Sequence, residues 1–132
     1  MSIHLLKKQP FNVPDGPYRS RVVSMYSVQG KGKCDSAVKI LFAPLCLETK
    51  LEQPVVASEY CVDAACEQLV DDLNTILSGG FEEQIDENGD FNEKSVNGRL
   101  VDIVVKSYHN GDHERPYTFV TAVFPPDTLN LN

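Results

Sequence analysis

Residues 99–124 read RLVDIVVKSYHNGDHERPYTFVTAVF and predict the two strands of a β-hairpin. Apolar side chains occupy every second position in residues 99–108, which is the period of a strand with one buried face. Asn110 and Gly111 favour a turn between strands, and β-branched and aromatic residues are frequent in the returning segment 117–124. The last third of the chain is therefore expected to be β-structure.

A change of period upstream of this hairpin predicts one helix. Apolar residues recur at helical spacing over residues 64–78, with Asp63 as a suitable N-cap and Gly79-Gly80 as a stop. Strand character marks three earlier segments, at residues 18–28, 37–47 and 51–60. The order of three strands, one helix and two strands predicts a mainly β fold, a five-stranded Greek-key barrel of the OB type.

The first predicted strand is expected to divide its side chains between two faces. Regular alternation puts Tyr18, Val22 and Tyr26 on one face. The other face then carries Arg19, Arg21, Val23 and Met25. In the later strand over residues 99–108, the same rule puts Val101, Ile103 and Val105 on one face and Asp102 on the other.

Length and composition predict one domain. A chain of 132 residues with 42% hydrophobic content can form one packed core. We expect an N-terminal arm at residues 1–15, the OB-like domain at 16–126 and a short tail at 127–132. No signal-peptide pattern and no long run of uncharged apolar residues occur, so a cytoplasmic location without membrane contact is expected.

The net charge of −7 is unevenly distributed along the chain. Residues 1–50 carry a net charge of +5, residues 51–98 of −11 and residues 99–132 of −1. Phosphate contacts depend on Lys and Arg, so the basic first part favours a nucleic-acid partner that the total charge alone would argue against. A solvated charged face is the alternative explanation of such runs.

The sequence contains no recognisable catalytic, metal or cofactor motif. The four cysteines, at positions 34, 46, 61 and 66, lack zinc-site spacing and are expected to be ordinary buried or reduced thiols. A calcium loop beginning at Asp86 would need glycine and glutamate where Phe91 and Asn97 stand. Phe91 is instead expected to attach this acidic connection to the body, together with Phe81 and Ile85. The histidines and acids of residues 109–114 lie across the predicted hairpin turn, where such residues are common when exposed, so they do not predict a metal site. Because none of these motifs is present, we predict a protein that is not an enzyme.

An OB barrel binds nucleic acid across strands two and three, between the loops that join strands one to two and four to five. In this sequence, the segments predicted to form these strands and loops carry Lys, Arg and His residues. The expected nucleic-acid-binding residues are Arg19, Arg21, Tyr26, Lys31, Lys33, Lys39, Lys106, Tyr108, His109, His113 and Arg115.

Aromatic side chains are the second requirement for binding single strands, because bases stack on them. Tyr26 and Tyr108 lie at predicted strand ends beside the basic loops and are the preferred stacking residues. Phe42 shares a strand face with apolar neighbours and is expected in the core. The further candidates are Tyr117 and Phe119, for which core packing is the alternative.

Three motifs carry a family resemblance. They are Gly16-Pro17-Tyr18-Arg19, the run Asn97-Gly98-Arg99-Leu100-Val101-Asp102-Ile103-Val104-Val105-Lys106, and Tyr117-Thr118-Phe119-Val120 before Phe124-Pro125-Pro126. Over roughly residues 16–126 the chain resembles small phage and prophage OB-type single-stranded DNA-binding proteins. The resemblance implies a replication or recombination accessory that coats exposed strands. The acidic total charge and the lack of an acidic tail depart from the usual pattern.

Two other kinds of partner remain open. The acidic helix and the connection after it could dock a basic protein, which would make the chain a protein-interaction module. Strand edges of a small barrel could pair in a homo-oligomer. The sequence does not choose between DNA and RNA as the single-stranded ligand.

Overall fold

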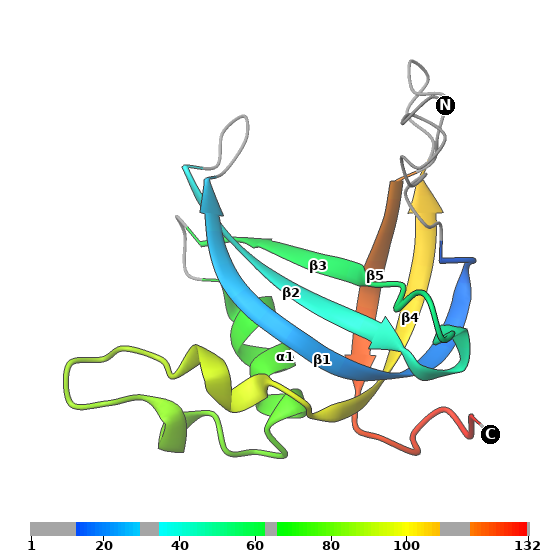
Figure 1. Cartoon of the computed structure of the whole chain (residues 1–132). Helices are drawn as coiled ribbons and strands as arrows, with labels where there is room; N and C mark the ends of the chain where they lie inside the picture. Colours follow the sequence, from blue (N-terminus) through cyan, green and yellow to red (C-terminus); the bar gives the residue numbers. More distant parts are fainter. Residues whose placement is uncertain (1–12, 30–34, 63–65, 109–116, 132) are drawn as a thin grey trace.

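The computed structural model describes residues 13–29, 35–62, 66–108 and 117–131 (Figure 1). The described residues form five strands and one α-helix, which follow one another in the predicted order. The strands are β1 (Gly16–Gln29), β2 (Ser36–Pro44), β3 (Val56–Cys61), β4 (Leu100–Tyr108) and β5 (Tyr117–Phe124), and the helix is α1 (Glu67–Ile76). Short 3-10 helices η2 (Leu45–Leu47), η3 (Glu82–Gln84) and η4 (Glu93–Val96) lie in the connections.

The five strands form one mixed sheet whose hydrogen bonds close into a ring, in the order β1-β2-β3-β5-β4 with β4 returning to β1. Every neighbouring pair is antiparallel except β3 and β5, which run parallel and meet at the single pair Ala57 and Phe119. β1 belongs to two ladders, because Gly16–Arg21 pairs with β4 and Ser20–Gln29 with β2. This long, bent strand therefore joins the two sides of the ring.

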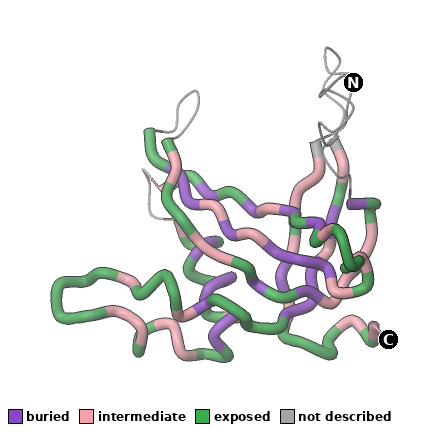
Figure 2. The backbone as a smooth tube through the Cα atoms, viewed as in Figure 1, coloured by how far each residue is buried: buried purple, intermediate pink, exposed green. Residues whose placement is uncertain are grey.

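The apolar core lies inside the ring, as the alternation of side chains predicts. Ile40 and Phe42 of β2 and Ile103 of β4 are completely buried. Figure 2 shows the buried positions following the strands, whereas the connection after α1 is mostly exposed. The predictions that Phe42 belongs to the core and that Val101, Ile103 and Val105 share one buried face are confirmed.

Helix α1 packs on the core through one apolar stripe, formed by Leu69, Leu73 and Ile76. The helix ends just before the predicted glycines: Leu77 is the C-cap, and Ser78, with a φ of +55°, is the first residue in the left-handed region. Gly79 follows with a φ of +89° and donates its N–H to the Asn74 carbonyl at 2.8 Å. Its N-cap is Cys66, so the prediction of Asp63 as the cap is wrong. No helix in the described part of the chain has the length and apolar character needed to cross a membrane.

The connection between α1 and β4 folds into a hairpin that Figure 1 shows extending away from the ring. The Asp86 carboxylate accepts the backbone N–H groups of Asn88 and Asp90 at 2.8 and 3.0 Å, which fixes the turn. Phe81 and Phe91 stack with ring centroids 5.4 Å apart and pack against the core. The expectation that these two rings attach the connection to the body is confirmed.

A buried polar contact ties α1 to β3. The Tyr60 hydroxyl donates to Asp72 Oδ2 at 2.5 Å, and Gln68 Nε2 donates to Asp72 Oδ1 at 2.9 Å. Asp72 is only 8% exposed, and this burial raises the pKa of its carboxyl above the usual value against the opposing effect of the two donors. The ionised carboxylate is therefore disfavoured by the fold relative to the unfolded chain.

We expect Asp72→Asn to change how stability depends on pH. A raised pKa means that the folded state binds the proton more readily, so this group's contribution to stability is greatest below about pH 4 and is lost as pH rises through the folded pKa. Asparagine does not titrate, so the variant should gain stability relative to the native protein as pH increases above about 4. Chemical denaturation across that range measures the difference.

The control for this variant is Glu82→Gln, the same charge change at an exposed site. It should leave the native pH profile unchanged apart from a constant offset. If Asp72→Asn also ran parallel to the native profile, burial of Asp72 would have no effect on its titration and the prediction would be wrong.

Candidate nucleic-acid interface

A β-bulge at Val23 decides which side chains of β1 face outward. The register with β2 shifts between Val22 and Ser24, so regular alternation is interrupted there. Val22 is buried and Met25 packs against the same core, whereas Tyr26 is 37% exposed. The prediction that Tyr26 shares a face with Val22, and that Met25 lies on the other face, is therefore wrong.

The bulge brings Tyr26 into a row with two charged side chains on the outer face of the sheet. Tyr26 pairs with Lys39 of β2, and Lys39 pairs with Glu59 of β3. Lys39 lies between the buried residues Val38 and Ile40, so its side chain points away from the core. Directly opposed residues share a face and have Cβ atoms about 4.5–5.5 Å apart. The row thus offers a ring, a cation and a carboxylate side by side.

A neighbouring row runs across all five strands of the same outer face. Successive pairings connect Ser24, Leu41, Ala57, Phe119 and Lys106. Lys106 of β4 is exposed, and Phe119 of β5 is half-buried. The outer surface of the sheet therefore combines apolar and aromatic side chains with two predicted cations, Lys39 and Lys106.

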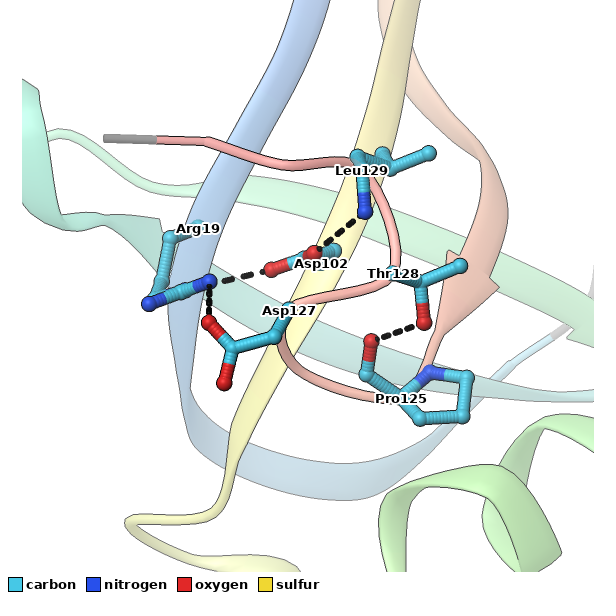
Figure 3. A network of polar contacts seen from close by, with 6 residues as sticks. All are labelled: Arg19, Asp102, Pro125, Asp127, Thr128 and Leu129. Atoms are coloured by element: carbon cyan, nitrogen blue, oxygen red, sulfur yellow. Dashed lines mark hydrogen bonds and ion pairs between the residues drawn. The ribbon is translucent and has the colours of Figure 1, made fainter.

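Arg19 has protein partners on a different part of the outer surface (Figure 3). Its Nε donates to Asp102 Oδ1 at 3.2 Å, and its Nη2 donates to Asp127. The two carboxylates raise the pKa of the guanidinium further above its ordinary value. Arg21 donates from Nη1 to the Gly98 carbonyl at 3.2 Å. Both arginines thus hold other segments of the chain in place.

Asp102 is the centre of this contact, although it stands on the outward side of β4. Its side chain is completely buried because residues 125–131 fold back over it. Oδ2 accepts the Leu129 N–H at 3.0 Å while Oδ1 accepts from Arg19. Thr128 fixes the turn by donating its hydroxyl, at 2.5 Å, to the backbone carbonyl three residues before it. Asp102 therefore joins β1, β4 and the C-terminal segment.

Several predicted contact residues fall outside the described part of the chain. They are Lys31, Lys33, His109, His113 and Arg115. The backbone of Tyr108 ends β4 and pairs with Tyr117, but the side chains of both tyrosines also lie outside the described part. Of the predicted residues, the structure brings Tyr26 and Lys39 into direct opposition and sets Lys106 in the adjoining row.

The sequence does not single out two residues of this surface, Glu59, which stands in the row with Lys39, and Asp102, which makes the buried contact with Arg19. Glu59 alternates with buried residues of β3, a pattern visible in the sequence, but its position beside Lys39 depends on the β2–β3 register. The alternation of residues 99–108 assigns Asp102 correctly to the outward side of its strand. Its burial depends on how the C-terminal segment folds, for which residues 125–131 give no periodic signal.

The expectation of reduced cysteines is wrong for Cys61, which is disulfide-bonded, whereas Cys46 and Cys66 are free. A disulfide requires Cα atoms about 4.4–6.8 Å apart, a distance that the fold sets and that spacing in the sequence does not reveal. Cys46 contributes to a cavity of about 370 Å³, which is bounded by the start of β1, η2 and Leu131. The cavity includes Arg19, whose Nε and Nη2 already have carboxylate partners.

No known protein family model matches this chain, and a search of curated proteins finds no match either.

Proposed function

We propose that this protein is an OB-type single-stranded DNA-binding protein that acts without catalysis, as a replication or recombination accessory. The observation that carries the proposal is the outer row of Tyr26 and Lys39 on a closed ring of five strands. The order of elements, with the helix between β3 and β4, supports an OB-type Greek key. OB folds bind strands across this outer surface of strands two and three.

The chemistry of the surface suits a flexible single strand. Lys39 and Lys106 can pair with phosphates, and within the described residues neither has an ion-pair partner of its own. The Tyr26 ring gives a base a flat face without reading its sequence. Duplex DNA buries its base faces by stacking, so the tyrosine would add nothing to duplex binding. The surface therefore favours single strands over duplex.

The acids lie mainly on another part of the molecule. α1 and the hairpin after it carry exposed carboxylates at Glu67, Asp71, Glu82, Glu83, Asp86, Glu87, Asp90 and Glu93. Figure 1 shows this hairpin projecting away from the ring. Exposed charges separated by more than about 8–10 Å are largely screened at physiological salt. A net charge of −7 is thus compatible with a local phosphate-binding surface.

The first test is fluorescence anisotropy of a labelled mixed-sequence single strand at about 50 and about 200 mM salt, with RNA and duplex controls. We expect the DNA single strand to bind more tightly than the duplex, with affinity falling steeply as salt increases. Absence of binding at micromolar protein, or equal binding of duplex and single strand, would contradict the proposal. Tighter binding of the RNA strand would replace DNA by RNA as the ligand.

Tyr26→Ala should weaken binding of single-stranded DNA by about tenfold, because a stacked base contributes about 1–3 kcal/mol. Tyr26→Phe keeps the ring and should bind like the native protein. The measurement is the same titration at fixed salt, with circular dichroism to confirm folding. A loss of affinity of equal size in both variants would assign the effect to the hydroxyl and refute stacking.

A second candidate function is docking of a basic protein partner at α1 and the acidic hairpin. The exposed carboxylates of this segment favour such docking. In its described residues, 66–98, Lys94 is the one basic residue among them. Binding to such a partner would be weakened by charge removal on the hairpin and would be insensitive to Lys39 and Tyr26. The nucleic-acid titration therefore separates the two functions.

A further inference from the structure

Glu59 is an acidic side chain in the middle of the proposed DNA-binding surface. It is exposed, stands on β3 directly opposite Lys39, and shares its row with Tyr26. A carboxylate beside a phosphate-binding cation weakens the attraction for any polyanion. Its place in this row is explained if it binds the part of the ligand that donates hydrogen bonds, which in a single strand is the edge of a base.

The Glu59 carboxylate is available for such a ligand. Among the described residues, neither Glu59 nor Lys39 takes part in an ion pair or a side-chain hydrogen bond. An ionised carboxylate has about four acceptor positions, and the lysine ammonium has three donors. The pair therefore offers adjacent acceptors and donors, on a row that also contains an exposed aromatic ring.

The four bases differ in how well they complement this pair. Unstacked bases in a single strand expose their Watson–Crick edges to proteins. Guanine presents two adjacent donors, N1–H and N2–H, next to the acceptor O6. Adenine and cytosine present one amino donor beside a ring acceptor, and thymine presents one donor between two carbonyls. Only guanine can donate two parallel hydrogen bonds to one carboxylate.

We propose that Glu59 and Lys39 select guanine in the bound strand. This inference rests on the proposed function. Glu59 accepts from guanine N1–H and N2–H, and Lys39 Nζ donates to O6 with one of its three N–H donors, which leaves the others for a phosphate. Cross-strand neighbours have Cβ atoms about 4.5–5.5 Å apart, so both side chains can reach one base edge. Tyr26 stacks on a base of the same strand.

The test compares three strands of about 16 nucleotides, the upper site size of one OB fold, by fluorescence anisotropy at fixed salt. One strand contains only thymine, the second has isolated guanines among thymines, and the third has inosine in place of each guanine. Inosine keeps N1–H and O6 but lacks the N2 amino group. We expect the guanine strand to bind about tenfold more tightly than the thymine strand, with inosine between them.

Glu59→Gln separates recognition from repulsion. Glutamine offers one acceptor oxygen, so the guanine preference should disappear, while removal of a negative charge slightly strengthens binding of the thymine strand. If Glu59 only repels phosphates, the substitution would strengthen binding of all three strands equally and keep any preference, which would overturn the proposal. Glu87→Gln makes the same charge change on the acidic hairpin and should preserve the native preference; its loss there would also overturn the proposal.

The titrations of the native protein distinguish failure of guanine selection from failure of the proposed function. Equal affinity for the three strands overturns guanine selection and leaves single-strand binding intact. No binding of any strand overturns the proposed function and guanine selection together.

Discussion

Asp102→Ala is expected to lower the free energy of unfolding by about 3 kcal/mol. The substitution removes a completely buried carboxylate that accepts from the Arg19 guanidinium and the Leu129 amide. Hydrogen bonds to charged groups contribute about 1.5–3 kcal/mol each, and the donors left behind lose their partner. Urea denaturation measures the stability, and hydrogen exchange of the Leu129 amide reports release of the C-terminal segment.

Asp127→Ala is the matched control for this prediction. Asp127 contacts the same guanidinium but is 82% exposed, so solvent screens the interaction. Its removal should cost less than about 1 kcal/mol. Equal losses in the two variants would show that the buried carboxylate has no special role in holding the segment.

Lys39→Glu combined with Lys106→Glu should weaken binding of single-stranded DNA by about tenfold or more at about 50 mM salt. Both lysines stand on the outer surface, and each reversal replaces a phosphate-binding cation by a repelling charge. Loss of two phosphate contacts should also flatten the plot of log affinity against log salt by about 1.4 units. Anisotropy titrations at several salt concentrations measure both effects.

The control for this variant reverses two exposed lysines elsewhere, Lys50 and Lys94, and gives the same net charge. Lys94 belongs to η4, on the acidic side of the molecule. The control should retain most of the affinity and nearly the full salt slope. Equal weakening by both pairs would mean that only total charge matters, and would refute a localised surface on β2 and β4.

The order of elements could be predicted because local patterns determine it. Val101, Ile103 and Val105 alternate along a strand whose one face is in the core, and the apolar stripe of α1 repeats at helical spacing. Hydrophobic burial and backbone period act within a few residues, so the sequence shows them directly. The ring closure, by contrast, joins Ala57 to Phe119, a long-range pairing that no local pattern encodes.

The bulge at Val23 is a feature of the site that the local sequence pattern could not predict. One extra residue reverses the facing of every later side chain in β1, so Tyr26 moves outward and Met25 inward. Nothing in the run of uncharged residues around Val23 distinguishes a bulge from regular alternation. Tyr26 was therefore chosen correctly as an exposed ring but assigned to the wrong face.

The charges in the sequence predict cations on the surface, but they do not show which of these cations are already paired with carboxylates of the protein. Arg19 and Lys39 both belong to the basic first part of the chain. Among the residues that the structure describes, carboxylates from β4 and the C-terminal segment bind Arg19, whereas none binds Lys39. Those partners lie far away in the sequence, so their effect could not be inferred from composition. Composition also could not show that Glu59 lies beside Lys39, because that position depends on the register between β2 and β3.

The single parallel pair between Ala57 and Phe119 also bears on how the chain folds. The β1–β2, β2–β3 and β4–β5 ladders join elements that are neighbours in sequence, so they can form early with small losses of chain entropy. The junction of β3 with β5 brings together distant segments and has little backbone hydrogen bonding to offset that loss. We therefore expect ring closure to be a late step in folding, and we expect this junction to open locally more readily than the longer ladders of the ring.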